Sequence, residues 1–426
     1  MHSGKTNHVG FISTRLAGTD GVSMEAAKWA DIFEMEGFTC FYMAGELDRP
    51  SDRSFLVEEA HFIHPAIRKI YNSCFGVHVR KPYVTEKIHR MKDTIKKQIY
   101  TFIKKFELEL LVIENAVSIP LNIPLGLAIT EVISETGMQT IAHHHDFFWE
   151  RERFLTNAAW DYLNMAFPPN SPSIHHVVIN SSADNQLSLR TGISSRIIPN
   201  VMDFENPLQI TDDYSSDVRR ALGIKDDELF VLQPTRIIKR KGIEHAIELV
   251  SRLDMKAKLV ISHASGDEGR EYERRIRDYS SIMNVNTCFV SRIIKERRGM
   301  TSKGKKIYAL SDIYPHADLV TYPSSFEGFG NGFLEAIYFH KPIVVNSYSI
   351  YNMDIKPKGF KVIELQGYVT EKALSQTREV MRNPELCREM VDYNYELAKR
   401  YYSYSTLRQN LRMLLLDCFG DGNTLD

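Results

Sequence analysis

SSFEGFGNGFLEAIYFHKPIVV, at residues 324–345, follows a mainly apolar run at 318–323. The run predicts a buried strand that ends at Pro323, and the apolar spacing from about Asn331 predicts a helix. Glycines at 328, 330 and 332 lie in the expected loop between this strand and this helix, or at the start of the helix. Glycine lets the backbone approach a ligand closely, and the unpaired N–H groups at a helix start favour a phosphate. This strand, loop and helix therefore predict an α/β unit that can receive a phosphate group.

The same switch between short apolar runs and amphipathic helices continues in both directions from this stretch. In the C-terminal half, further strands are expected at 229–235, 257–263, 286–290 and 342–347. In the N-terminal half, strands are expected at 9–14, 38–43, 108–114, 139–145, 175–181 and 195–199. Strand–helix alternation of this kind predicts parallel sheets with helices on both faces.

The alternation pauses at 199–217, which contains two prolines, two asparagines and the run TDDYSSD. We therefore expect an α/β protein with two doubly wound, Rossmann-like domains, 1–205 and 206–403. The tail from about Pro384 reads as helical and ends in the amphipathic segment LRQNLRMLLLDCF. Ligands of open α/β sheets bind outside the carboxyl ends of the strands, so the cleft between the two domains is the expected site.

The composition agrees with an ordinary globular protein. At ~150 residues per domain, a chain of this length holds two or three domains, and its formal net charge is −1. That balance argues against a dedicated nucleic-acid binder. The five cysteines are scattered, which excludes a Cys-x-x-Cys zinc site and is typical of a reduced, cytoplasmic protein. The apolar stretch at 110–130 contains Glu114, Asn115 and two prolines, so no transmembrane segment is expected.

Two carboxylates make the glycine-rich loop more specific. Glu327 lies in the loop and Glu335 lies one turn into the helix, with seven residues between them. They could accept hydrogen bonds from hydroxyls at both ends of a sugar nucleotide, whereas a plain strand-to-helix turn needs neither. The segment resembles the E-x7-E motif of retaining glycosyltransferases with the GT-B fold, especially glycosyltransferase family 4.

The resemblance continues upstream at 234–249, PTRIIKRKGIEHAIEL, which is similar to that family's G-R-x4-K-G segment. Gln-Pro-Thr stands in place of the usual glycine, but the spacing from Arg236 to Lys241 is kept. Two fixed cations after a strand suit a diphosphate leaving group, on which negative charge builds as the glycosidic bond breaks. The alternative is a solvated basic loop, which the position and the partner motif disfavour.

The N-terminal half resembles the same family at two places. The stretch at 18–46 is similar to its first strand–loop–helix unit, with Gly18 and Gly21 facing the diphosphate. The stretch AHHHDFFWERERF at 142–154 matches, at His145, the histidine that the family places near the donor hexose. A metal site on the three adjacent histidines is the alternative. It is disfavoured because neighbours in a strand point to opposite faces, so that His143 and His145 share a face without His144.

The resemblance implies a retaining hexosyltransferase that moves a glucose- or mannose-type sugar from a UDP-, GDP- or ADP-linked donor to a hydroxyl acceptor. It implies a donor-binding C-terminal domain, an acceptor-binding N-terminal domain and a final helix, about 404–426, that crosses back to the N-terminal domain. No metal is required, and Mg²⁺ is dispensable or auxiliary. The expected catalytic residues are His145, Glu327, Arg236 and Lys241. The expected donor contacts are Gly18, Gly21, Arg236, Lys241, Glu327, Gly328, Phe329, Gly330, Asn331, Gly332 and Glu335.

The acceptor is less defined. A small soluble sugar or a glycerate glycoside is favoured over a polymer, and the expected contacts are Trp149, Glu150, Arg151 and Arg153. The basic helix at 85–105 has seven Lys/Arg and could touch an anionic membrane, although a solvated helix face is favoured. Two other functions stay open: a GT-B phosphorylase or epimerase, and a catalytically silent transferase that acts as a binding subunit.

Overall fold

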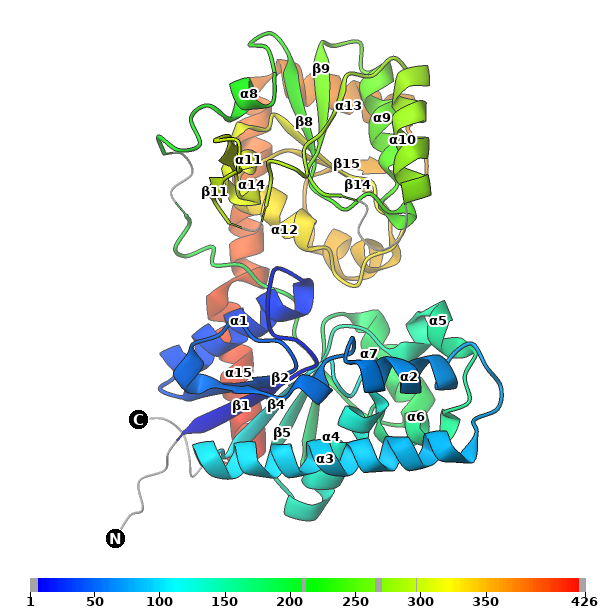
Figure 1. Cartoon of the computed structure of the whole chain (residues 1–426). Helices are drawn as coiled ribbons and strands as arrows, with labels where there is room; N and C mark the ends of the chain where they lie inside the picture. Colours follow the sequence, from blue (N-terminus) through cyan, green and yellow to red (C-terminus); the bar gives the residue numbers. More distant parts are fainter. Residues whose placement is uncertain (1–6, 209–211, 265–269, 296, 421–426) are drawn as a thin grey trace. The chain divides into compact units, whose positions relative to one another are not determined.

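The structure is a computed structural model that describes residues 7–208, 212–264, 270–295 and 297–420. It divides into two compact units. The first contains Met1–Asn200 and Ser405–Asp426, and the second contains Val201–Tyr404. Both units are drawn in Figure 1.

The first unit is built on a seven-stranded sheet with the order β3-β2-β1-β4-β5-β6-β7. Every neighbouring pair is parallel. The strands are β1 (His8–Ile12), β2 (Thr39–Ala44), β3 (Ser54–Leu56), β4 (Leu110–Glu114), β5 (Thr140–His144), β6 (Ile174–Val178) and β7 (Arg196–Ile197). The strand order reverses between β1 and β4, which is where open sheets of this kind bind ligands at the strand ends.

Helices cover both faces of this sheet (Figure 1). They are α1 (Gly21–Met35), α2 (Pro65–Cys74), α3 (Pro82–Phe106), α4 (Ile123–Thr136), α5 (Glu152–Leu155), α6 (Trp160–Ala166), α7 (Ser181–Thr191) and α15 (Tyr404–Phe419). The long helix α3 turns its apolar stripe inward, where Ile95, Ile99 and Phe102 pack with residues of β4 and α4. This burial of one helix face is what the amphipathic spacing predicts.

The last helix, α15, is fastened to the end of α1. Glu36 follows α1, and its side chain is only 1% exposed. Arg412 of α15 donates to one Glu36 oxygen at 2.7 Å, and Arg408 donates to the other. Burial raises the pKa of Glu36, but the two arginines outweigh it and hold that pKa below its ordinary value. The expected return of the final helix to the N-terminal domain is therefore confirmed.

The second unit has a six-stranded parallel sheet with the order β10-β9-β8-β13-β14-β15. Its strands are β8 (Leu229–Gln233), β9 (Ala257–Ile261), β10 (Thr287–Phe289), β13 (Leu319–Tyr322), β14 (Ile343–Asn346) and β15 (Ile363–Leu365). Its helices are α8 (Val218–Ala221), α9 (Ile243–Arg252), α10 (Arg270–Ile282), α11 (Leu310–Ile313), α12 (Asn331–Tyr338), α13 (Glu371–Arg382) and α14 (Pro384–Tyr402).

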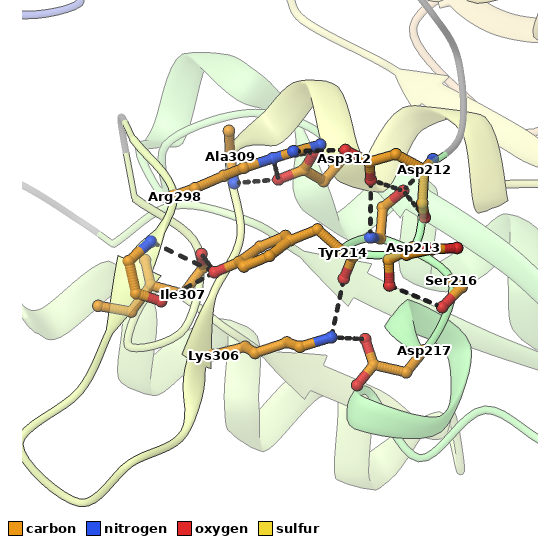
Figure 2. Close-up of polar contacts among 12 residues, drawn as sticks. Asp212, Asp213, Tyr214, Ser216, Asp217, Arg298, Lys306, Ile307, Ala309 and Asp312 are labelled. Atoms are coloured by element: carbon orange, nitrogen blue, oxygen red, sulfur yellow. Dashed lines mark hydrogen bonds and ion pairs between the residues drawn. The ribbon is translucent and has the colours of Figure 1, made fainter.

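One hairpin in this unit has no counterpart among the predicted strands. Strands β11 (Gly299–Met300) and β12 (Lys306–Ile307) pair antiparallel outside the main sheet. Figure 2 shows how polar side chains hold the hairpin: the Tyr214 hydroxyl lies 2.8 Å from the carbonyl oxygens of Gly299 and Ile307. Arg298 also bonds Asp312 beside the hairpin, at 2.6 Å. Polar contacts therefore anchor this segment to α11.

No helix in the described part of the chain is long and apolar enough to cross a membrane. The stretch at 110–130 is instead strand β4 followed by the first half of α4. On α3, Lys92 and Lys96 are paired with Glu131 of α4, at 2.7 and 3.0 Å. Part of the basic charge of the segment at 85–105 is thus neutralised, and its contact with a membrane stays a prediction.

Candidate active site

The glycine-rich loop joins β13 to α12, and α12 begins at Asn331 as predicted. Two of its glycines make room for tyrosines that pack beneath the loop. A Cβ at Gly330, where φ is +117°, would lie 2.5 Å from the hydroxyl of Tyr348. A Cβ at Gly332 would lie 2.7 Å from the ring of Tyr322. These glycines are therefore required by local packing, whether or not a ligand also approaches the loop.

Glu327 lies in this loop at the centre of a cluster of charges. Its side chain is 8% exposed, and the Lys241 ammonium donates to Oε1. The Arg240 guanidinium donates to Oε2 at 2.9 Å. Burial raises the pKa of Glu327, but Lys241 and Arg240 outweigh it, so the pKa lies below its ordinary value. The structure thus brings together two predicted site residues and adds Arg240, which the sequence reasoning did not single out.

The backbone explains why Lys241 meets Glu327. The turn at Lys239–Lys241 leads into Gly242, which has a φ of +57°. A Cβ on Gly242 would lie 2.4 Å from the carbonyl oxygen of Pro323. The N–H of Ser325 also donates to the carbonyl oxygen of Arg240 at 2.8 Å. Because the loops after β8 and β13 touch, the lysine of one reaches the glutamate of the other.

Arg236 differs from Lys241 in its surroundings. It is exposed, and among the described residues none forms a hydrogen bond or ion pair with its guanidinium. Burial lowers the pKa of His263, and the positive charges of Arg236 and Lys241 lower it further. His263 follows β9, so it is a half-buried neighbour of this cluster that the sequence motifs did not indicate.

Buried side-chain hydrogen bonds hold the Gln-Pro-Thr segment that stands before Arg236 in place of the glycine usual in the resembling family. Gln233 ends β8, and its side chain donates to Thr235 at 2.8 Å. The Thr321 hydroxyl of β13 donates to Gln233 at 2.7 Å. These bonds satisfy the polar atoms of Gln233, so that Gln-Pro-Thr can start the loop where a glycine is usual.

Glu335 has a separate setting on α12. It is half-buried, and the hydroxyl of Tyr314 donates to its Oε2 at 2.8 Å. Tyr314 follows α11, the element that Asp312 and Arg298 anchor to the hairpin. Burial and the charge of Glu335 raise the pKa of Tyr314 well above its ordinary value, which keeps the phenol a donor. The two glutamates of the motif are therefore held by different partners.

In the first unit, the end of β5 brings His143 and His145 to one carboxylate. His145 Nε2 lies 3.0 Å from Glu114 Oε2, and His143 Nδ1 lies 3.1 Å from the same oxygen. His144 points to the other face, where it bonds Ser118 at 2.5 Å and His176 at 2.9 Å. The predicted alternation of the three histidines is confirmed.

Glu114, His143 and His145 could each offer one ligand atom to a metal ion, and these atoms lie within 4.8 Å of one another. The carboxylate is already bonded to both rings without an ion. Burial raises the pKa of Glu114, but the two histidines outweigh it and lower that pKa. Burial likewise lowers the pKa of His145, but Glu114 outweighs it and raises that pKa. Glu114 was not predicted as part of the site, and the absence of a metal requirement stays a prediction.

The loop before α1 holds the two other predicted glycines. Gly18 has a φ of +75°, and its N–H donates to Asp48 at 2.9 Å. Gly21 is the first residue of α1 and is exposed. Asp20, which precedes Gly21, accepts from the backbone N–H of Ser23 at 3.2 Å. The aspartate is therefore an N-cap, which accounts for its presence in this loop.

The four residues predicted to bind the acceptor follow β5, and they have different local roles. Glu150 accepts from the backbone N–H of Phe147 at 2.7 Å, and burial raises the pKa of its carboxyl. Trp149 stacks on the ring of Phe147 at 4.5 Å. Arg151 pairs with Asp146, and Arg153 lies 4.7 Å from the ring of Phe154. Local contacts thus explain all four conformations, and acceptor binding stays a prediction.

Known proteins resemble the chain in sequence. The sequence profile of the family described as glycosyl transferases group 1 matches residues 215–397. The mannosylglucosylglycerate synthase of Thermotoga maritima is 30% identical over 426 residues, covering 92% of this chain and 96% of that protein. The mannosylglucosylglycerate synthase of Petrotoga mobilis is 31% identical, covering 84% of this chain and 86% of that protein.

Solved structures resemble the chain in fold. Sucrose-phosphate synthase from Thermosynechococcus elongatus has a TM-score of 0.67 at 15% identity, covering 97% of this chain and 99% of that one. HepE of Anabaena, solved in complex with UDP-glucose, has a TM-score of 0.62 at 12% identity, covering 96% and 99%. Together with the two parallel sheets, these likenesses confirm the predicted fold class of two Rossmann-like domains.

Proposed function

The chain belongs to the glycosyl transferases group 1 family, as a retaining glycosyltransferase with the GT-B fold, and from this premise we propose that it transfers a mannose-type hexose from a nucleotide-diphosphate sugar to a hydroxyl of a glucosylglycerate-type acceptor. The names and near-complete coverage of the Thermotoga and Petrotoga relatives support this pair of substrates. A small, anionic acceptor of this kind agrees with the glycerate glycoside that the sequence favours.

The charge cluster around Glu327 is the observation that supports the donor site best. Lys241, Arg240 and Arg236 carry three positive charges after β8, and Glu327 carries one negative charge after the neighbouring strand β13. Two formal positive charges therefore remain for a diphosphate, and they neutralise the charge that builds on it as the bond breaks. We assign Lys241 and Arg236 to the diphosphate, with the amides of 328–332 as further donors to it.

The remaining donor contacts follow from the same arrangement. Glu335 binds the ribose hydroxyls, and its hydrogen bond from Tyr314 holds it in place. Glu327 binds the donor sugar, and His145 of the first unit orients that sugar. Gly18 and Gly21 contact the diphosphate from the loop before α1. Because no free carboxylate takes the place of a nucleophile in these assignments, retention arises from attack on the same face, with a donor phosphate oxygen receiving the acceptor proton.

The proposed acceptor contacts are Trp149, Glu150, Arg151 and Arg153. An arginine suits the carboxylate of glycerate, because a guanidinium can bind both oxygens of a carboxylate. No metal is required in this proposal, since Lys241 and Arg236 neutralise the leaving group. The nucleotide base of the proposed donor is uracil, guanine or adenine.

A substrate matrix tests the proposal. UDP-, GDP- and ADP-linked glucose and mannose are each incubated with glucosylglycerate, with free glycerate and with glucose, without added metal. We expect a product larger than glucosylglycerate by one hexose, seen by mass spectrometry, and an anomeric configuration retained by NMR. Lys241→Ala, which removes a proposed diphosphate contact, is assayed in the same way. Lys239→Ala is its control, because Lys239 is an exposed lysine of the same turn. Transfer to free glycerate or glucose alone would contradict the acceptor, and an inverted anomer would contradict the mechanism.

A further inference from the structure

Glu114 is a carboxylate in an unusual place. It is the last residue of β4, after Leu, Leu, Val and Ile, and its side chain has no exposed surface. A buried carboxylate is costly unless it is hydrogen-bonded or paired. In the sheet, Glu114 stands opposite His143 of β5, so that His143 and His145 both lie on its face. The end of β5 therefore supplies the partners that Glu114 needs.

The bond to His145 determines which ring nitrogen carries a proton. An ionised carboxylate only accepts hydrogen bonds, so His145 Nε2, at 3.0 Å from Glu114 Oε2, is the donor. This leaves Nδ1 as the nitrogen available for a ligand, and among the described residues none forms a hydrogen bond with it. The His145 side chain is 9% exposed, so it is held by the core and still reaches the surface.

The next residue, Asn115, holds the backbone of the same histidine. Its φ is +59°, and its own N–H donates to the carbonyl oxygen of His143 at 3.0 Å. Its side-chain oxygen accepts from the N–H of His145 at 3.1 Å. Its side-chain nitrogen donates to Asp146 at 2.8 Å. Glu114, the last residue of β4, and Asn115, which follows it, thus fix the ring and the backbone of His145.

His143 completes the arrangement from the buried side. Its Nδ1 lies 3.2 Å and 3.1 Å from the two oxygens of Glu114, and its ring stacks on Trp29 at 4.2 Å. The other nitrogen of His143 is buried, and no residue that the structure describes forms a hydrogen bond with it. The carboxylate is therefore held between two rings, and only the ring of His145 reaches the surface.

We propose that Glu114 and Asn115 are positioning residues, which fix the tautomer and the orientation of His145 so that its Nδ1 meets the donor sugar. The proposal rests on the proposed function, because it takes His145 as the residue that contacts the donor hexose. It adds two residues that act through His145 and need not touch the substrate.

The first test is kinetic. Glu114→Gln keeps the shape but offers one acceptor atom and one donor group. Because both rings contact Glu114 Oε2, the two histidines then compete for the single amide oxygen unless one of them changes tautomer. We expect kcat to fall about 10- to 100-fold while the Kd of the nucleoside diphosphate changes less than about twofold, since the nucleotide lies on the second unit. Adding His143→Phe to this variant frees the amide oxygen for His145, and we expect it to restore kcat at least about fivefold.

Matched variants separate positioning from simple damage to the fold. Asn115→Gly keeps a backbone that allows positive φ and removes the side chain, so we expect a drop of about fivefold in kcat with unchanged nucleotide binding. Ser118→Ala removes a buried hydrogen bond to His144 on the other face of β5, and kcat should stay within about twofold of the wild type. An equal loss of kcat in Ser118→Ala would overturn the proposal.

The second test does not depend on activity. In protein labelled with ¹⁵N-histidine, the signal that disappears in His145→Gln reports the tautomer of His145. We expect the proton on Nε2 in the wild type and a changed signal in Glu114→Gln. A proton on Nδ1 alone in the wild type, or one equivalent of zinc or manganese by elemental analysis, would overturn the proposal. Wild-type kcat in His145→Gln would instead contradict the role of His145 in the proposed function.

Discussion

Neutralising Glu327 should separate nucleotide binding from sugar transfer. In Glu327→Gln, the negative charge that Lys241 and Arg240 neutralise is removed, while the side chain keeps its size. That charge also opposes a diphosphate bound at Lys241 and Arg236. Because Glu327 is assigned to the donor sugar, the same change removes a contact that strengthens in the transition state. We therefore expect the nucleoside diphosphate to bind more tightly and the transfer reaction to become slower.

The expected magnitudes follow from charge and burial. A phosphate that contacts Lys241 lies within ~5 Å of the Glu327 carboxylate, and at an effective dielectric constant of about 20 the repulsion is ~3 kcal/mol. Screening by solvent in an open site leaves roughly 1 kcal/mol, or about fivefold in Kd. Loss of one transition-state contact costs ~3 kcal/mol, or on the order of a hundredfold in kcat.

The substitution should also lower stability. The side chains of Lys241 and Glu327 are 10% and 8% exposed, so Lys241 loses its partner in a buried place. Breaking such a pair costs ~3–5 kcal/mol, and we expect the lower end because the glutamine still accepts one hydrogen bond. At roughly 2–4 °C per kcal/mol for a unit of this size, the Tm should fall by about 6–12 °C. A nucleoside diphosphate should restore more of the Tm in the variant than in the wild type.

Calorimetric titration with the nucleoside diphosphate tests the expected tighter binding, and transfer kinetics measured beside it test the expected fall in kcat. Arg240→Gln is the matched control, since removing the half-buried cation that pairs with the other Glu327 oxygen should weaken nucleotide binding by a similar factor. Binding that weakens in Glu327→Gln, or a kcat equal to that of the wild type, would refute the assignment of this residue to the donor sugar beside the diphosphate.

Three further predictions concern other parts of the chain. Lys241→Ala should lower kcat/KM by a few hundredfold (~3–4 kcal/mol) in initial-rate assays, whereas Lys239→Ala should leave it nearly unchanged. Tyr314→Phe should raise the donor KM about fivefold with kcat within about twofold, because it loosens Glu335 in the ground state and the transition state alike. Glu36→Gln should lower the free energy of unfolding, measured in urea at pH 7, by ~2 kcal/mol. This value is kept small because the arginines of α15 that pair with Glu36 are exposed to solvent. Since the pKa of Glu36 is lowered from 4.5 on folding, its stabilisation is present above that value and is lost as the pH falls through the folded pKa, so the variant should respond less to acid below pH 4.5.

The sequence predicted the central strands of both sheets because each contains a short apolar run between turns. It did not predict β3 (Ser54–Leu56) and β15 (Ile363–Leu365), which are three-residue strands at sheet edges with polar or exposed positions. The β11–β12 hairpin lies in a basic stretch and is held by Tyr214 and Arg298. The spacing of apolar residues predicts only segments that bury an apolar face. It therefore does not predict a segment that is held by side-chain hydrogen bonds.

Motif spacing identified Lys241 and Glu327, because a fixed number of residues after each strand places both at one edge of the sheet. It could not identify Arg240, which follows Lys239 and precedes Lys241 in a run of three cations. The 3₁₀ turn at Lys239–Lys241 decides which of them points inward, and Lys241 is the buried one. The tight approach of Gly242 to Pro323 holds this turn against the second loop, and the two residues are 81 positions apart in the sequence.

Glu114 shows that a partner distant in the sequence can still leave a signal. An ionisable residue at the end of an otherwise apolar strand cannot remain buried without donors, because the cost of removing its charge from water must be offset locally. In a parallel sheet, groups at the ends of adjacent strands can reach it, and three consecutive histidines lie at the end of β5 and directly after it. Because side chains alternate between the two faces of a strand, His144 points away from Glu114, and His143 and His145 are the partners that the pattern permits. The charge that argued against a membrane span in this segment is thus the same charge that holds the candidate catalytic histidine.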